Sequence, residues 1–220
     1  MTQKGVTMVT RRDVNIGIAA TAAMPAAAQA GARALPPPNQ SGGKPLMAAL
    51  KLRRSTREYS ERALSPQALS DILWAGFGIN RPSGDRTAPY WRHVMVMDVY
   101  AAMADGVWLY DPKAHALAPY MTDDIRADTG MQDFVAKAPL NLIYVAHGDR
   151  MVDVSPEDRR LYASVDAAFI GQNVYLYCAS EGLASVFRGA VDYARLARRL
   201  KLPEQQFVTF AQTVGYPKGE

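Results

Sequence analysis

Three arginines lie within five residues, at Arg53, Arg54 and Arg57, and Ser55 stands among them. In an extended chain, residues two apart face the same side, so Arg53, Ser55 and Arg57 would present two guanidinium groups and a hydroxyl together. Guanidinium groups bind phosphate oxygens with strong, charge-assisted hydrogen bonds. The segment therefore predicts a phosphate site. A solvated basic turn between two helices is the competing interpretation, because most charge runs lie in solvent.

The rest of the sequence has few groups suited to acid–base, nucleophilic or metal chemistry. Cys178 is the single cysteine, which excludes an intramolecular disulfide and a thiolate cluster within one chain. The three histidines, His93, His115 and His147, lack the close helical spacing of a zinc site. No Walker A loop, nucleophile elbow, H-E-x-x-H motif or dinucleotide-binding glycine pattern is found. This scarcity of reactive side chains and catalytic motifs favours a protein whose bound cofactor performs the chemistry.

Composition limits the architecture and the partners. A chain of 220 residues with 49% apolar content suits one compact domain with a sizeable core. The formal charge of +4 is modest, and the basic residues are scattered rather than gathered into runs with aromatics. Nucleic acid is therefore not an expected partner.

The first thirty residues read as an export signal. Arg11-Arg12 precede a weakly apolar, alanine-rich run at residues 14–28, and Ala28-Gln29-Ala30 is the small-x-small pattern that a signal peptidase cleaves. The stretch resembles a twin-arginine signal, which predicts a periplasmic protein. A membrane anchor is the competing interpretation, although the run is poor in leucine. Residues 31–44 are rich in proline and glycine, which predicts a flexible arm. Residues 45–220 are expected to form the folded domain.

Helix and strand signals alternate along this domain. Pro45 and Ser65-Pro66 are typical helix starts. Residues 106–117 predict a hairpin around an Asp-Pro-Lys turn. The apolar run at residues 138–146 predicts a buried strand near the centre of the sheet, and residues 207–214 predict another strand.

The longest predicted helix covers residues 160–180 and ends at Gly182. Cys178 falls within it, with no histidine or helix N-terminus beside it, and is expected to be a buried, unreactive thiol. Small residues at every fourth position would let another element approach closely, either within the chain or from a partner chain: Ala163, Ala167 and Gly171.

Five segments together resemble the FMN-dependent nitroreductase family, whose superfamily includes the thiazoline and oxazoline dehydrogenases. The segments span nearly all of the chain from Pro45 to Lys218, and a strand of the G-L-Y-L-Y-D type resembles the azoline-dehydrogenase branch. The resemblance implies an α+β fold with a mixed, mainly antiparallel sheet surrounded by helices, in an intertwined homodimer. The five segments are R-x-S-x-R at 53–57, T-A-P at 87–89, the strand at 106–111, E-G-L at 181–183 and G-Y-P-K at 215–218.

The resemblance also implies which residues bind the flavin. Arg53 would hold the FMN phosphate together with Lys218, with Arg54 and Ser55 in the same cofactor segment. Arg57 would face N1 and O2 of the ring and stabilise the anionic reduced form.

Two further regions would approach the ring. The backbone N–H at Arg188 or Gly189 would meet flavin N5, unless the loop is a simple turn. His93 falls near the position of a ring-contacting asparagine, and it could instead be a half-exposed strand residue that precedes Val94. Tyr90 stands where relatives have a small residue, so either another residue contacts the ring or the substrate pocket is narrowed.

The function that the resemblance implies is oxidoreduction by hydride transfer through flavin N5 in a ping-pong cycle. Nitroaromatics, quinones or similar electron-poor compounds would be the acceptors. NAD(P)H would be the donor in the cytoplasm, and a quinol or protein donor would replace it after export. An azoline-type dehydrogenase is the alternative within the class, and a non-catalytic flavin- or ligand-binding module is the alternative outside it.

Overall fold

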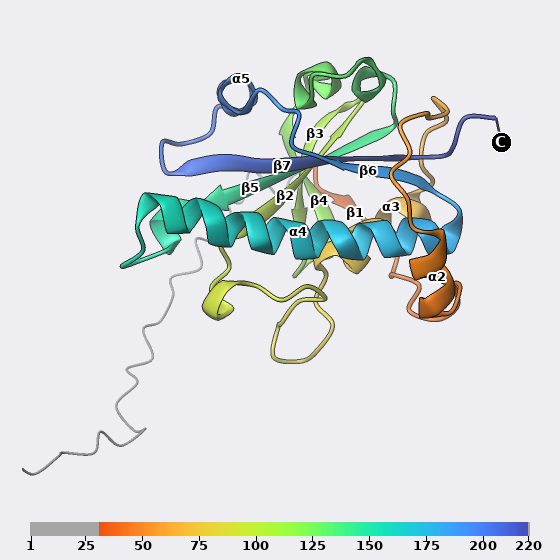
Figure 1. Cartoon of the computed structure of the whole chain (residues 1–220), viewed down its shortest axis with the longest axis horizontal. Coiled ribbons are helices and arrows are strands. Elements are labelled where there is room, and N and C mark those ends of the chain that lie inside the picture. Colours follow the sequence, from red (N-terminus) through yellow and green to blue (C-terminus); the bar gives the residue numbers. More distant parts are fainter. Residues whose placement is uncertain (1–30, 220) are drawn as a thin grey trace, which may run out of the picture.

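The computed structural model describes residues 31–219, and the predicted export signal at residues 1–30 lies outside them. Its centre is a seven-stranded sheet in the order β1-β4-β3-β2-β5-β7-β6, with antiparallel pairing at every step (Figure 1). The α+β fold implied by the resemblance is thereby confirmed, although the sheet of the described residues is antiparallel throughout rather than mixed. The strands are β1 (Arg33–Ala34), β2 (Met97–Met103), β3 (Gly106–Asp111), β4 (Ala116–Met121), β5 (Leu140–His147), β6 (Ala184–Arg188) and β7 (Gln206–Gly215).

Helices cover both faces of the sheet. The longest helix, α4, runs along one face with α3 and α2 packed against it, and α5 lies on the opposite face (Figure 1). Within the described residues, no helix is both long and apolar enough to cross a membrane. The helices are α2 (Leu46–Leu52), α3 (Pro66–Phe77), α4 (Pro156–Glu181) and α5 (Tyr193–Arg199), with the short 3-10 turns η1 (Trp91–His93), η2 (Arg126–Thr129), η3 (Asp133–Ala136) and η4 (Gly148–Arg150).

The two longest helices begin in the same way. Ser65 and Ser155 each accept a backbone N–H from three residues on, at 3.1 Å, and a proline follows each serine. The cap at Ser65 was expected from the sequence, whereas α4 begins at Pro156 rather than at residue 160. The first turn of α4 is polar, so the apolar spacing does not reveal it. Gly182 ends α4 with a φ of 76°, as expected for a left-handed cap.

Strand β5 is the centre of the core. All eight of its residues are buried, as predicted. It lies inside the sheet between β2 and β7, one position from the predicted centre. Successive side chains point to opposite faces, so Leu142 and Tyr144 pack under α3 and α4 while Ile143 and Val145 pack under α5. A strand with cores on both sides is continuously apolar for this reason.

The row of small residues on α4 faces the sheet of the same chain. Ala163 and Ala167 are fully buried, and a Cβ at Gly171 would overlap the ring of Phe187 on β6. Helix α4 packs against both β6 and β7. The row therefore serves an intrachain contact, which was one of the two alternatives left open by the sequence.

The arm at residues 31–44 is attached to the domain, which differs from the predicted flexible arm. Arg33 and Ala34 form β1 and pair with Leu117 and Ala116 of β4. Leu35 is buried in the core. Composition alone did not reveal this attachment, because it depends on a strand edge more than eighty residues away in the sequence.

A cation-lined cavity as the candidate functional site

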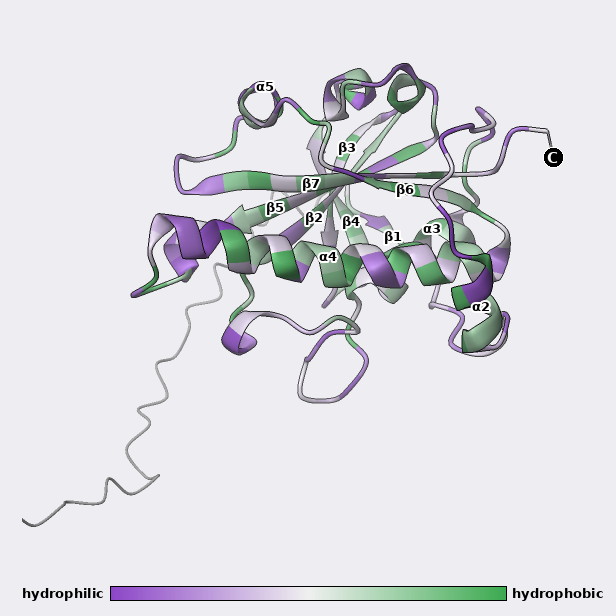
Figure 2. Cartoon of the chain, viewed as in Figure 1, coloured by the Kyte–Doolittle hydropathy of each residue, from purple (hydrophilic) through white to green (hydrophobic). Residues whose placement is uncertain are grey.

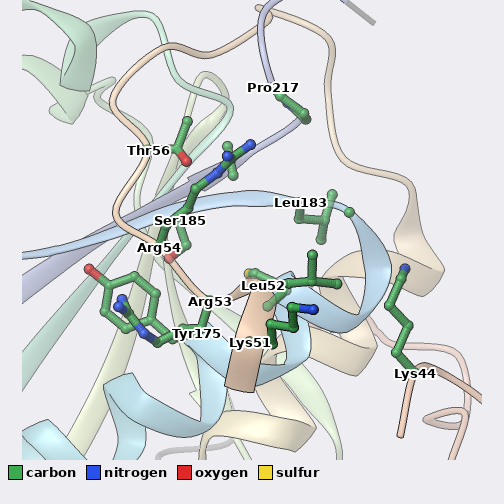
Figure 3. A pocket seen from close by; sticks show the side chains of 14 residues that line it. Lys44, Lys51, Leu52, Arg53, Arg54, Thr56, Tyr175, Leu183, Ser185 and Pro217 are labelled. Carbon is green, nitrogen blue, oxygen red and sulfur yellow. The ribbon is translucent and has the colours of Figure 1, made fainter. Parts of the chain in front are cut away.

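A cavity of about 470 Å³ opens where the end of α2, the last turns of α4 and the start of β6 meet (Figure 3). Its volume lies within the range of small-molecule sites. It is lined by four cationic residues and no carboxylate, together with apolar and hydroxyl side chains: Lys44, Lys51, Leu52, Arg53, Arg54, Thr56, Tyr175, Cys178, Ala179, Gly182, Leu183, Ala184, Ser185 and Pro217.

The charge of this lining is one-sided. Lys44, Lys51 and Arg54 are exposed and Arg53 is half-buried. No aspartate or glutamate lies among the lining residues to offset them. Four like charges around one space repel each other, and an anion placed among them would relieve that repulsion. The cavity is thus suited to a phosphate or another anion.

Tyr175 of α4 connects the segments that form the cavity wall. Its hydroxyl accepts the backbone N–H of Phe187 at 2.7 Å and shares a hydrogen bond of 2.8 Å with Ser55. The guanidinium carbon of Arg53 lies 5.3 Å from the centre of the Tyr175 ring, within cation–π range. Sequence reasoning placed Tyr175 among the apolar residues of a helix and missed this role. An aromatic residue at helical spacing carries no local sign of a bridging hydroxyl.

The R-x-S-x-R segment is held against the ends of two strands. The N–H of Thr56 donates to the carbonyl of Ser185 at 2.9 Å, and the hydroxyl of Tyr59 donates to the carbonyl of Thr56 at 2.6 Å. Tyr59 also forms an isolated bridge with Pro217, just after β7. The first and fifth resembling segments, distant in sequence, therefore meet at the cavity.

Five of the predicted site residues lie at or beside this cavity. Arg53 and Arg54 line it, and Ser55 contacts it through Tyr175. Arg57 is exposed and follows the lining residue Thr56. Lys218 is exposed and follows the lining residue Pro217.

Arg188 lies apart from the cavity, inside the core. Its guanidinium donates to Thr213 Oγ1 at 3.1 Å, to the carbonyl of Thr129 at 2.9 Å and to Asn141 Oδ1 at 3.1 Å. Burial lowers the pKa of Arg188 to about 10. The side chain is thus committed to internal contacts. These contacts concern the side chain alone, so the backbone N–H contact to a flavin at Arg188 or Gly189 stays a prediction. Gly189, directly after β6, is exposed.

His93 also lies outside the cavity lining. It ends the η1 turn, and its imidazole is exposed with Nδ1 3.5 Å from Asp85. Asp85 accepts the hydroxyl of Tyr90 at 2.6 Å. That hydrogen bond, followed by one from Ser83, lowers the pKa of Asp85 to about 2. Both Arg92 and His93 have positive φ, 44° and 57°, so His93 belongs to a tight turn rather than to the start of a strand.

Cys178 lines the cavity but is almost fully buried. Burial raises the pKa of its thiol to about 12, so the nucleophilic thiolate is scarce at neutral pH. The predicted burial is confirmed. Among residues 31–219, no group of three or more histidine, cysteine, aspartate or glutamate side chains could hold a metal ion.

Comparisons with known proteins give a consistent result. The profile of the Nitroreductase family matches residues 50–216. A protein of Methanocaldococcus jannaschii described as a nitroreductase is 30% identical over 162 residues, which cover 69% of this chain and 82% of that protein. A crystal structure from Ralstonia eutropha JMP134, also described as a nitroreductase, is 40% identical with a TM-score of 0.82, covering 86% of this chain and 90% of the other.

A more distant likeness concerns the fold. The NADPH:FMN oxidoreductase of Vibrio harveyi, solved in complex with NAD+, is 20% identical to this chain. Its TM-score is 0.58, and the match covers 79% of this chain and 69% of that protein.

Proposed function

This chain belongs to the Nitroreductase family, and from that premise we propose that it is an oxidoreductase that uses FMN. The observation that carries the proposal is the cavity with four cations and no carboxylate, placed at the R-x-S-x-R segment. We assign this cavity to the phosphate of the cofactor. A phosphate ester, such as that of FMN, would fit among the cations of this cavity.

The groups around the cavity suit a phosphate ester. Arg53 and Arg54 offer guanidinium donors, and Thr56 offers a hydroxyl beside them. The half-buried position of Arg53 against the Tyr175 ring restricts its side chain, so less freedom is lost when a ligand binds. Lys218 follows Pro217 at the cavity wall and would add a further cation.

Other residues of the chain would act on the ring. When bound, FMN supplies the redox chemistry, taking hydride from a donor and passing it from N5 to an acceptor in a ping-pong cycle. Arg57 is exposed beyond the cavity and would stabilise negative charge on the reduced ring. Gly189 has no side chain, so its backbone could approach the ring closely.

For the substrates we favour reduction of electron-poor acceptors such as nitroaromatics and quinones. NAD(P)H would be the donor in the cytoplasm, and a quinol or a protein donor would replace it after export. The relatives described as nitroreductases support the acceptor class. The Vibrio harveyi protein is described as an NADPH:FMN oxidoreductase, which supports NADPH as a donor. The segment that resembles the azoline dehydrogenases forms β3, which does not line the cavity. The contacts at the cavity therefore give no support to the dehydrogenase alternative.

We also propose that the protein is a homodimer. Large apolar side chains are exposed on α2 and on the N-terminal part of α4. Figure 2 shows apolar residues along both helices. Exposed patches of this kind mark interaction surfaces. The exposed residues are Leu46, Met47, Leu50 and Leu52 on α2, and Leu161, Tyr162, Val165 and Phe169 on α4.

The test is the visible absorption spectrum of the purified protein, followed by identification of any flavin released on denaturation. Flavin absorption with FMN in the supernatant is the expected result. A protein that stays colourless after incubation with FMN would contradict the assignment. Bound flavin that dithionite reduces, but no diffusible donor reduces, would favour the non-catalytic module instead.

A further inference from the structure

The arm formed by residues 33–44 runs from the edge of the sheet to the cavity. It begins as β1 beside β4 and then crosses α3. Two proline carbonyls and one backbone N–H of the arm are bound by α3 side chains. These three hydrogen bonds are Ser70 Oγ to the carbonyl of Pro36 at 2.6 Å, Gln67 Nε2 to the carbonyl of Pro37 at 3.0 Å, and the N–H of Asn39 to Asp71 Oδ1 at 2.7 Å.

The arm ends on the last turn of α4. The N–H of Lys44 donates to Ser180 Oγ at 2.6 Å, and its ammonium donates to the carbonyl of Ser180 at 2.7 Å. Gly43, with a φ of 74°, approaches so closely that a Cβ would lie 2.6 Å from Ser180 Oγ. An ammonium group has three N–H donors, so two remain for other partners. Lys44 is a lining residue of the cavity, and Figure 3 shows it at one side.

We propose that the arm is a strap that delivers Lys44 to the cavity as an additional phosphate-binding residue. Lys44 lies before residues 50–216, which match the family, and outside the R-x-S-x-R segment. The inference rests on the proposed function in that the cavity ligand carries a phosphate. Docking of the arm and binding of the phosphate then strengthen each other.

The coupling follows from the charges around the cavity. Docking the arm brings Lys44 to the same cavity as Lys51, Arg53 and Arg54, and this like-charge approach opposes docking. The carbonyl of Ser180, in the last turn of α4, offsets part of that cost by accepting a hydrogen bond from the ammonium. A bound phosphate would offset the rest. Coupling free energies are reciprocal, so the docked arm must raise phosphate affinity by the factor by which phosphate favours docking.

Three variants of the full chain test the strap. Lys44→Met removes the ammonium and keeps a long side chain. Gln67→Ala removes an arm anchor on α3, outside the cavity lining. Lys113→Met is the control, because Lys113 is an exposed lysine in the turn between β3 and β4. For each protein, FMN affinity is measured by fluorescence titration, and hydrogen exchange of residues 33–44 is measured with and without FMN.

Lys44→Met should weaken FMN binding by about two- to fivefold, the range for an exposed charged contact. In the wild-type protein FMN should slow exchange along the arm, and this effect should be lost in Lys44→Met. Gln67→Ala should weaken FMN binding by a smaller factor, and Lys113→Met should match the wild type. Equal FMN affinity in Lys44→Met and wild type, or exchange of the arm that FMN does not alter, would overturn the strap.

Failure of the cofactor assignment would give a different result. If the wild-type protein does not bind FMN, the proposed function fails, and inorganic pyrophosphate replaces FMN as the probe of the arm. Slower exchange at residues 33–44 with pyrophosphate in the wild type, but not in Lys44→Met, would still support the strap. Unchanged exchange in both proteins would overturn it.

Discussion

Arg53 and Arg188 are both arginines from segments that resemble cofactor-binding segments, yet their surroundings are opposite. Arg53 is half-buried at a cavity wall, where its neighbours are other cations and an aromatic ring. Arg188 is 3% exposed, and all three of its guanidinium nitrogens donate to neutral oxygen acceptors. One guanidinium faces a space that an anion can enter, whereas the other is an internal structural group.

The difference shows how a ligand-binding arginine is recognised. At Arg188 the chain supplies the acceptors itself, because Asn141, Thr129 and Thr213 converge on the guanidinium. At the cavity no carboxylate is among the lining residues, so the positive charge there is left for an anion from outside. The resemblance implies a phosphate contact from the Arg53 side chain, but only a backbone N–H contact at Arg188 or Gly189. The three-dimensional distribution of acceptors shows what each side chain binds.

Replacing Arg188 should produce the largest effect, and on stability. Arg188→Met removes three donors from buried acceptors, which should lower the free energy of unfolding by about 2–4 kcal/mol. Urea denaturation measures the change, and Arg188→Lys, which keeps a charge and one donor group, should be less affected. FMN affinity of the protein that remains folded should change less than stability does. Lost flavin with unchanged stability would show that Arg188 is a ligand-binding group.

Arg53→Ala should give the opposite pattern. Loss of a charge-assisted phosphate contact should weaken FMN binding by about 1.5–3 kcal/mol. The free energy of unfolding of the apoprotein should change by no more than about 0.5 kcal/mol, because the side chain is not part of the core. Arg62→Ala is the matched control, since Arg62 lies over the Tyr216 ring and outside the cavity lining. Unchanged flavin retention in Arg53→Ala would refute the assigned role.

Tyr175→Phe should have an intermediate effect on both properties. The variant keeps the ring under Arg53 and removes the hydroxyl that binds the N–H of Phe187 and Ser55. One such hydrogen bond contributes about 0.5–1.5 kcal/mol to the free energy of unfolding. FMN affinity should fall because Ser55 loses its anchor to α4. A variant that matches the wild type in urea denaturation and in flavin titration would show that Tyr175 does not organise the cavity.

Cys178→Ala should have the smallest effect on flavin binding and activity. The thiol lines the cavity but is 1% exposed, and burial raises its pKa to about 12. Because that pKa lies above the ordinary value, the thiolate fraction grows only as the pH rises toward 12. Iodoacetamide should therefore leave the native protein unmodified at pH 8 and modify it after unfolding. Inactivity of Cys178→Ala with normal flavin content would contradict the inert thiol.

Local signals in the sequence predicted much of the fold. The serine cap of α3, the glycine end of α4 and the continuous apolar run of β5 each depend on residues next to one another in the chain. These signals are strong because capping and burial act within a few residues. The early start of α4 was missed because its first turn is polar.

Long-range contacts were the part that sequence reasoning could not supply. Nothing near Leu35 indicates that the arm pairs with β4, and nothing near Tyr175 indicates its contact with Ser55. The R-x-S-x-R pattern did indicate an anion site, because its charges need a partner wherever the fold places them. The commitment of Arg188 to internal acceptors depends on Thr129, Asn141 and Thr213, which come from three other parts of the chain.

The most direct test of the central claim, that the cavity binds the cofactor phosphate, compares two flavins that differ only in that group. The flavin-free protein is titrated with FMN and with riboflavin, and the two dissociation constants are compared. FMN should bind at least about tenfold more tightly, because a charge-assisted contact contributes about 1.5–3 kcal/mol. Arg53→Ala should reduce that ratio. Equal affinity for the two flavins would contradict the assignment of the cation-lined cavity to the phosphate.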